Sequence, residues 1–396
     1  MSNIVIVGGG FAALQTIKMV RKIDQDVAIT MITADAGVEY SKPNLSHAFS
    51  QAQTPQALAV NNAQQLAEQY NVVIKTGVLV NEIDTKQQCV HVDGQTIHYS
   101  KLVLATGATP FIPPAEGLKH SATITLNSLE EFEKHKAEVD DATRITVIGG
   151  GLIGVELAFD LQTAGKDVTI IEPASYLLNS LVPPFVSLEL ERELTKAGVT
   201  VETDSAICRA TYLNDGVRLQ TTASRLIRAD TVIAAAGLRP NTALATQAGI
   251  EVNKGIVVDD TLKTSAHNVY AIGDCAEIEG RVMAYLQPAI LSANVLAQQL
   301  LREKKNLSIV EEKLSMTKTK FSLPHMITKV KTPSYPIQLA GRDIHTAQSW
   351  ETRFEPNGLI AKGFNEDNQL VGFIVTGAHT KAAFPLLKEL QASSPA

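Results

Sequence analysis

Two glycine-rich turns carry the residue types and spacing that most constrain the chemistry of this chain. Each follows a run of mostly β-branched residues: Gly8 follows residues 4–7 and Gly149 follows residues 145–148. Such a run predicts a buried parallel strand that turns sharply into a helix, whose free N–H groups and positive dipole end can hold a pyrophosphate. The expected contacts are Gly8, Gly9, Gly10, Phe11, Ala12 and Ala13 in the first turn, and Gly149, Gly151, Leu152, Ile153 and Gly154 in the second.

An acidic residue follows each turn at the end of the next predicted strand. Glu172 stands 23 residues after Gly149, the spacing of a carboxylate that binds the adenine ribose. It would repel a 2′-phosphate at ~5 Å by about 3 kcal/mol at an effective dielectric of ~20, so NADH is favoured over NADPH. The corresponding residues of the first half are Thr33 and Ala34, with Asp35 as a looser match. Two such sites predict two dinucleotides, most simply a flavin and a nicotinamide that exchange electrons.

Length and composition predict a protein of two or three domains and give no sign of a nucleic-acid or membrane partner. The chain has 396 residues, 45% of them hydrophobic and 19% charged, and a net charge of −6. This charge gives no reason to expect nucleic-acid binding, and no run approaches 18 apolar residues, so we expect no membrane insertion. Because a strand begins by Ile4, we expect no signal peptide and a cytoplasmic location. A monomer is favoured.

Neither the cysteines nor the basic residues form a recognisable site by their spacing alone. Cys89, Cys208 and Cys275 are isolated, so we expect three small buried hydrophobic residues and no metal site. Residues 302–331 carry a local charge of +5, which predicts either a solvated helix end and loop or a docking surface for an acidic partner. Their basic residues are Arg302, Lys304, Lys305, Lys313, Lys318, Lys320, Lys329 and Lys331.

The order of the predicted elements gives the fold class. Each turn opens a strand–helix–strand unit, and residues 312–396 contain short strands and turns that indicate a separate domain. The prediction is an α/β protein with two Rossmann-like dinucleotide-binding domains and a smaller α+β C-terminal domain. Other expected elements are helices over residues 55–70, 186–197 and 284–301, a hairpin over residues 80–92, and short strands over residues 199–232.

Five motifs together resemble the FAD-dependent pyridine nucleotide oxidoreductases, which share the glutathione reductase-like fold with two dinucleotides. Besides the two turns, the motifs are Ala105-Thr106-Gly107, the segment 236–241 and Gly273-Asp274. The resemblance implies a discontinuous FAD-binding domain, with the NAD-binding domain inserted in it. The implied ranges are 1–111 and 243–311 for FAD, 112–242 for NAD and 312–396 for the C-terminal domain.

Members of this family that use different electron acceptors differ in the cysteines that lie over the flavin. Disulphide reductases carry a CxxxxC pair there, and NADH oxidases and peroxidases carry a single cysteine, but residues 36–60 of this chain contain none. The resemblance therefore implies that FAD gives its electrons to a partner outside the chain. The finer similarity is to rubredoxin–NAD(+) reductases, through residues 32–35, 40–43, 255–259, 273–277 and 330–333.

The resemblance also implies roles for single residues. Lys42 would lie near flavin N5 and stabilise negative charge on the reduced ring, and Glu156 would face it as its partner and as a nicotinamide contact. Asp274 would bind the ribityl hydroxyls, and Lys331 would approach the flavin from the C-terminal side. Further cofactor contacts are implied for Val80, Ala105, Thr106, Gly107, Gly237, Gly273 and Leu286.

The implied activity is electron transfer from NADH through FAD to rubredoxin, a small acidic iron–sulfur protein, in support of alkane hydroxylation. A ferredoxin reductase of an oxygenase system, or an NADH oxidase, is the alternative enzyme, and acceptor preference would separate them. An NADH-sensing flavoprotein without a dedicated acceptor is the alternative outside catalysis.

Overall fold

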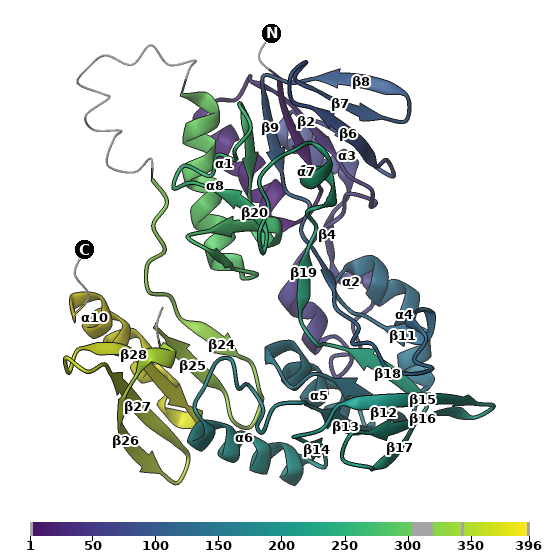
Figure 1. Cartoon of the computed structure of the whole chain (residues 1–396), viewed down its shortest axis with the longest axis vertical. Helices are drawn as coiled ribbons and strands as arrows, with labels where there is room; N and C mark the ends of the chain where they lie inside the picture. Colours follow the sequence, from purple (N-terminus) through teal and green to yellow (C-terminus); the bar gives the residue numbers. More distant parts are fainter. Residues whose placement is uncertain (1–2, 303–319, 342–343, 394–396) are drawn as a thin grey trace. The chain divides into compact units, whose positions relative to one another are not determined.

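The structure is a computed structural model that describes residues 3–302, 320–341 and 344–393 (Figure 1). It comprises two compact units. The first consists of Met1–Lys42, Gln56–Thr109 and Leu238–Leu323, and the second of Pro43–Pro55, Pro110–Gly237 and Pro324–Ala396. The boundaries expected for three domains stay a prediction.

The first unit is built on a five-stranded parallel sheet. Its central strand is mostly β-branched and almost wholly buried, which suits a strand covered on both faces. Two helices that lie far apart in the sequence, α1 (Phe11–Ile23) and α8 (Leu286–Leu301), pack against each other beside it (Figure 1). The strand order is β21 (Val269–Ala271), β9 (Lys101–Leu104), β1 (Asn3–Val7), β2 (Ala28–Ile32) and β5 (Val73–Lys75).

The register of this sheet brings the carboxyl ends of its strands to one edge. Val7 lies opposite Ile32 and Leu104, and Leu104 lies opposite Ala271. The loops that follow these strands, beginning with the Gly8 turn, are therefore neighbours. In open α/β sheets this carboxyl edge is where ligands bind.

The second unit repeats this plan. Ile148 lies opposite Ile171 and Ala234, so the Gly149 turn and the end of the next strand again share one edge. The helix that follows the turn, α5 (Leu152–Thr163), is buried over most of its length. The parallel strand order is β11 (Thr123–Ile124), β18 (Thr231–Ala234), β12 (Arg144–Ile148), β13 (Asp167–Ile171) and β14 (Thr200–Glu202).

In each half of this repeat an antiparallel three-stranded sheet follows an edge strand of the parallel sheet, β5 in the first half and β14 in the second. The first contains β6 (Val80–Asp84), β7 (Cys89–Val92) and β8 (Gln95–His98), and includes the expected hairpin. The second contains β15 (Ile207–Leu213), β16 (Gly216–Thr221) and β17 (Leu226–Ala229). This duplication confirms the predicted pair of Rossmann-like units.

The C-terminal part of the second unit is an antiparallel sheet covered by a helix. The helix α10 (Ala383–Ser393) packs on the sheet through Leu386 and Leu390, against a core that includes the fully buried Phe373. The fold class of the whole chain is therefore confirmed. The strand order is β24 (Thr328–Val330), β25 (Ile337–Ala340), β28 (Leu370–Thr376), β27 (Gly358–Phe364) and β26 (Ser349–Glu355).

Two sequence-based expectations about local structure are wrong. The helix expected over residues 55–70 is interrupted, because α2 (Pro55–Leu58) is followed by a strand, β4 (Ala59–Asn61), that pairs with β3 (Glu39–Tyr40). Asn62 then starts α3 (Ala63–Tyr70) with a capping box. Cys208 is exposed, because it lies on an outward-facing position of the β15 strand, whereas Cys89 and Cys275 are buried as expected.

The remaining described elements connect these parts. A 3₁₀ helix, η1 (Lys42–His47), carries Lys42 at its first position. The others are α4 (Leu129–Asp141), α6 (Pro184–Ala197), α7 (Ala243–Gln247), β10 (Ala108–Pro110), β19 (Leu238–Pro240), β20 (Ile256–Val258), β22 (Ala276–Ile278), β23 (Arg281–Val282), and the 3₁₀ turns His120–Ala122, Gly273–Cys275, Ile344–Thr346 and Gly377–Ala382.

The glycines of the second turn should differ in what they contribute to stability. A Cβ at Gly154 would lie 1.9 Å from the carbonyl oxygen of Gly149, whereas a Cβ at Gly151 would meet no atom within 4 Å. We expect Gly154→Ala to lower the free energy of unfolding by about 3 kcal/mol, and Gly151→Ala by less than about 1 kcal/mol. Urea unfolding followed by circular dichroism measures both. Equal losses would contradict the close packing of α5 on the turn.

Candidate functional site

The first glycine turn has the shape of a phosphate cradle. Gly8 has φ +114°, and a Cβ there would lie 2.1 Å from the carbonyl oxygen of Ala105. Gly10 precedes α1 and offers the helix no side-chain cap among the described residues, and the space where its Cβ would stand is open. The N–H groups of the first turn of α1 can therefore meet an anion directly, which fits a dinucleotide pyrophosphate.

Asp35 lies beside this turn. Its Oδ1 accepts hydrogen bonds from Thr33 Oγ1 and from the N–H of Gly37, both at 2.8 Å. A Cβ at Gly9 would lie 3.1 Å from the same oxygen, so the carboxylate reaches the middle of the turn. This position suits the predicted contact with a ribose, despite the looser spacing in the sequence.

The loop after β9 is held by Asn241, which has no individual role among the sequence-based expectations. Thr106 Oγ1 donates to the carbonyl oxygen of Asn241 at 2.7 Å, and Asn241 Nδ2 donates back to that of Thr106 at 2.8 Å. The N–H of Asn241 also donates to the carbonyl oxygen of Gly107 at 2.9 Å. Asn241 thus fixes the predicted contact segment 105–107 from a position over 130 residues away.

Asp274 follows β21 at the same carboxyl edge. Gly273 has φ +78°, and a Cβ there would lie 2.6 Å from Ala12 Cβ, so this turn packs against the start of α1. Lys42 Nζ lies 3.7 Å from Asp274 Oδ2. Burial raises the pKa of Asp274, and the nearby Lys42 ammonium opposes this rise. The first unit therefore brings Lys42 and Asp274 together, although the sequence had assigned Lys42 a different partner.

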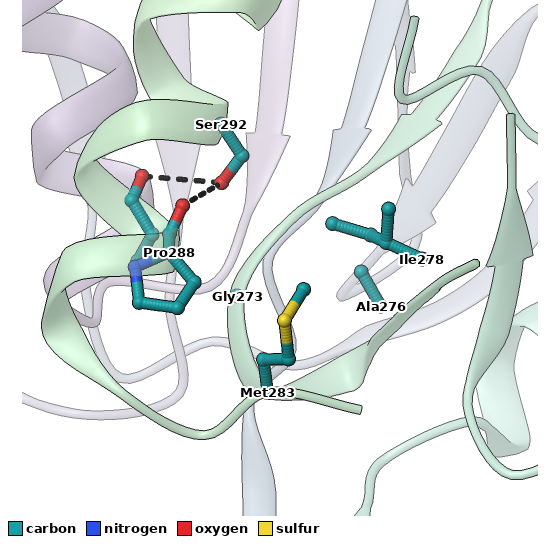
Figure 2. A pocket seen from close by; sticks show the side chains of 7 residues that line it. Gly273, Ala276, Ile278, Met283, Pro288 and Ser292 are labelled. Carbon is teal, nitrogen blue, oxygen red and sulfur yellow. Dashed lines mark hydrogen bonds between the residues drawn. The ribbon is translucent and has the colours of Figure 1, made fainter. Parts of the chain in front are cut away.

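A small pocket adjoins this turn in the first unit (Figure 2). The hydroxyl of Ser292 donates to the carbonyl oxygen of Pro288 at 2.6 Å within α8, so the lining offers mainly apolar surface. Leu286, a predicted cofactor contact, is the first residue of α8, and Val80 is the buried first residue of β6. The lining residues are Gly273, Ala276, Ile278, Met283, Pro288, Ala289 and Ser292.

The second glycine turn has the same geometry as the first. Gly149 has φ +107°, and a Cβ there would lie 2.6 Å from the carbonyl oxygen of Ala235. Gly151 stands before α5 with open space at its Cβ position and, among the described residues, without a side-chain cap. This turn therefore fits a second dinucleotide, and Ile153, on the first turn of α5, is half exposed beside it.

Glu172 reaches across the second turn as the sequence spacing predicts. Its Oε2 accepts the N–H of Gly150 at 2.6 Å, and its Oε1 accepts that of Ala174 at 2.9 Å. These bonds fix the carboxylate at the turn, where it can also accept bonds from a ribose. Gly237, another predicted contact, has φ +101°, and its carbonyl oxygen accepts the N–H of Phe111 at 2.9 Å.

Glu156 is buried on α5 and joins two other segments of the second unit. Its Oε2 accepts a hydrogen bond from Ser46 Oγ at 2.7 Å, and its Oε1 accepts the N–H of Lys331 at 2.7 Å. His47 Nε2 lies 3.7 Å from the same Oε2. Lys331 Nζ lies 3.5 Å from the carbonyl oxygen of Pro43. That Glu156 faces Lys42 stays a prediction.

Asp160, one helical turn after Glu156, is a second buried carboxylate that sequence reasoning missed. It accepts the N–H of Phe49 at 2.9 Å, the N–H of Ser50 at 3.1 Å, and the hydroxyl of Ser50. Burial raises its pKa, and these donors oppose the rise. The spacing of the two acids, four residues apart on a predicted helix, indicated that they share one face. Their partners Ser46 and Phe49 could not be predicted in this way, because they lie about 110 residues earlier in the chain.

The described parts of the chain contain no group of three or more metal-ligating side chains. Over the same residues, no helix combines the length and apolar character needed to cross a membrane. Of the basic stretch, Lys304, Lys305, Lys313 and Lys318 lie outside the described residues, and Lys320 pairs with Asp260 at 2.7 Å. A docking role for this stretch stays a prediction.

Two known protein families match most of the chain between them. Residues 2–294 match the family described as pyridine nucleotide-disulphide oxidoreductase. Residues 320–390 match the family described as rubredoxin binding C-terminal domain.

Relatives of similar length share much of the sequence. The nitric oxide reductase FlRd-NAD(+) reductase of Aliivibrio fischeri is 46% identical over 391 residues, which cover 99% of each chain. The protein of the same name from Vibrio vulnificus is 45% identical over 387 residues, 98% of this chain and 97% of that one. Among solved structures, the covalent putidaredoxin reductase–putidaredoxin complex has a TM-score of 0.87 at 23% identity, covering 100% of this chain and 94% of that one. FAD and NADH fit this likeness and the two turns, and the chain belongs to the pyridine nucleotide-disulphide oxidoreductase family.

Proposed function

We propose that this chain passes electrons from NADH through FAD to rubredoxin. The observation that carries the proposal is the match of residues 320–390 to a rubredoxin-binding domain. Residues 36–60 contain no cysteine that could relay electrons to a disulphide, which supports an acceptor outside the chain. When bound, FAD supplies a carrier that accepts a hydride and releases its electrons one at a time.

The relatives favour one setting for this activity. Their printed names combine nitric oxide reductase with FlRd, so the acceptor we propose is the rubredoxin centre of a flavorubredoxin that serves nitric oxide reduction. The alkane hydroxylation expected at first finds no support in these names. A cytoplasmic location and a monomeric state stay predictions.

We assign each of the two dinucleotides to a different glycine turn. We assign the first turn to FAD, with α1 and Gly10 holding its pyrophosphate and Asp35 its ribose. We assign the second turn to NADH, with α5 holding the pyrophosphate and Glu172 the ribose hydroxyls. The assignment rests on the two carboxylates placed to bind a ribose, and on the resemblance of both motifs to those of the FAD-dependent pyridine nucleotide oxidoreductases.

Lys42 supplies positive charge close to the first site. Its ammonium group lies 3.7 Å from Asp274, which is mostly buried, while about a third of the Lys42 side chain is exposed. Such a side chain can turn from Asp274 toward negative charge that develops on a bound cofactor. We assign it this stabilising role, and Glu156 the role of holding the segment that follows Lys42.

The choice of acceptor tests the proposed function directly. We expect the purified, FAD-loaded protein to reduce the rubredoxin domain of a flavorubredoxin with NADH at a kcat/KM about tenfold or more above that for a [2Fe–2S] ferredoxin. The measurement is the absorbance change of each acceptor at low ionic strength, with dioxygen removed. A ferredoxin that is reduced equally well, or better, would point to an oxygenase-type reductase and refute the proposal.

The coenzyme preference should depend on Glu172. In Glu172→Gln the repulsion of a 2′-phosphate is removed, so we expect the preference for NADH over NADPH to fall by up to roughly a hundredfold. The measurement is the ratio of kcat/KM for the two coenzymes. FAD content serves as the control, because Glu172 lies at the other turn, and an unchanged ratio would contradict the ribose role.

A further inference from the structure

The C-terminal sheet ends in a strand with one open side. Among the described residues, β26 is the last strand of this sheet and pairs only with β27 (Figure 1). Most of its residues are exposed. An open edge presents a row of backbone N–H and C=O groups that can pair with another strand. A further chain can therefore add to the sheet at β26.

The hydrogen bonds of β27 show which backbone groups of β26 point outward. The N–H of Leu359 in β27 donates to Thr376 Oγ1 in β28 at 2.9 Å, so this residue bonds away from β26. Bonded and unbonded pairs alternate along an antiparallel ladder, so its partner Phe354 belongs to an unbonded pair, as do Thr352 and Trp350. The backbone groups of these three residues therefore face away from β27.

The sequence of β26 is complementary to itself when two copies run antiparallel. With Thr352 opposite its own copy, Glu351 lies opposite Arg353 of the second copy, and Trp350 lies opposite Phe354. Opposite charges and aromatic pairs that face each other across neighbouring strands are stabilising. A register displaced by two residues in either direction would place Glu351 or Arg353 opposite itself. Charge therefore selects a single register.

The charged side chains lie where a second copy can reach them. Glu351 and Arg353 both line a groove between β26 and α10. The Arg353 side chain is 75% exposed and pairs with Glu355 of its own strand at 2.6 Å. An exposed pair of this kind is weak, so the guanidinium can turn to another carboxylate. His379 Nε2 lies 3.1 Å from Glu355, which then keeps a neighbour.

The aromatic side chains of β26 lie on a surface that α6 shares. The Phe185 ring of α6 meets the rings of Trp350 and Phe354 edge to face, with centroids 5.7 and 6.3 Å apart. Phe354 nevertheless stays 60% exposed, and Leu188, one helical turn after Phe185, is 58% exposed. An aromatic side chain from a second copy opposite Phe354 would cover part of this apolar surface.

We propose that two copies of this chain associate through β26, so that their C-terminal sheets join into one antiparallel sheet about a two-fold axis at Thr352. The same residues meet from both sides, as in other interfaces with two-fold symmetry. A single strand edge buries less area than a permanent dimer needs, so the association is reversible. It replaces the monomer expected from the sequence, and it does not depend on the proposed function.

Sedimentation of the full-length, FAD-loaded protein over a range of concentrations tests the association. We expect a monomer–dimer equilibrium with a Kd on the order of 10 µM. Arg353→Glu brings two acids face to face at both ends of the interface and should raise this Kd at least about tenfold. Glu351→Arg, which brings two arginines together, should do the same.

The two substitutions combined exchange the charges and restore the attraction. The combined variant should therefore return the Kd to within about threefold of the starting value. A combined variant as weak as either single one would overturn the proposal. So would a protein that stays monomeric up to about 200 µM, or a dimer whose Kd none of these variants changes.

Arg228 provides a matched control. It lies on β17, an outer strand of its three-stranded sheet among the described residues, is half exposed, and pairs with Asp215. Arg228→Glu changes the net charge as Arg353→Glu does, and it should leave the Kd within about twofold. An equal weakening in both would assign the effect to net charge and contradict pairing through β26.

Disulphide formation tests the register. The background is Cys208→Ser, because Cys208 is exposed. Thr352→Cys places two thiols on a bonded pair with Cα atoms ~5.5 Å apart, within reach of a disulphide, whereas the two copies of Arg353→Cys stand at ~8 Å, beyond it. We expect mild oxidation to give a covalent dimer of the first variant and little of the second on a non-reducing gel. Equal yields would refute the register.

Discussion

The close approach of one backbone to another at the two strand ends is the constraint on which both sites depend. At each turn the first glycine stands where a Cβ would overlap a carbonyl oxygen of the neighbouring loop, at 2.1 Å from Ala105 and 2.6 Å from Ala235. Only glycine adopts these positive φ values without strain and leaves that space free. The helix can then begin at the carboxyl edge of the sheet, with its N–H groups directed at a ligand.

The carboxylates of the two sites lie close to these helix starts. Asp35 and Glu172 each approach the middle glycine of a turn, and Asp274 follows a strand that ends on the same edge as the first turn. The chain then uses α5 twice, because the helix that starts at the second turn also carries the two carboxylates that hold residues 46–50.

The features that the sequence could predict are local ones. β-branched runs, glycine spacing and the distance to Glu172 are written in fewer than 30 consecutive residues, and they predict both sheets and both turns correctly. The bonds of Asn241 and Asp160 could not be predicted, because each joins residues more than 100 positions apart. The break in the helix expected over residues 55–70 was missed because pairing of β3 with β4 outweighs local helix propensity.

The assignment of FAD to the first turn and NADH to the second is tested most directly by blocking one proposed pyrophosphate site at a time with a methyl group. Gly10→Ala and Gly151→Ala each place a methyl group in open space in the absence of ligand, so neither should disturb the fold. We expect Gly10→Ala to lose its bound flavin absorbance, and Gly151→Ala to keep that absorbance but require at least about tenfold more NADH for half-maximal flavin reduction. Loss of flavin from Gly151→Ala, with Gly10→Ala unaffected, would contradict the account.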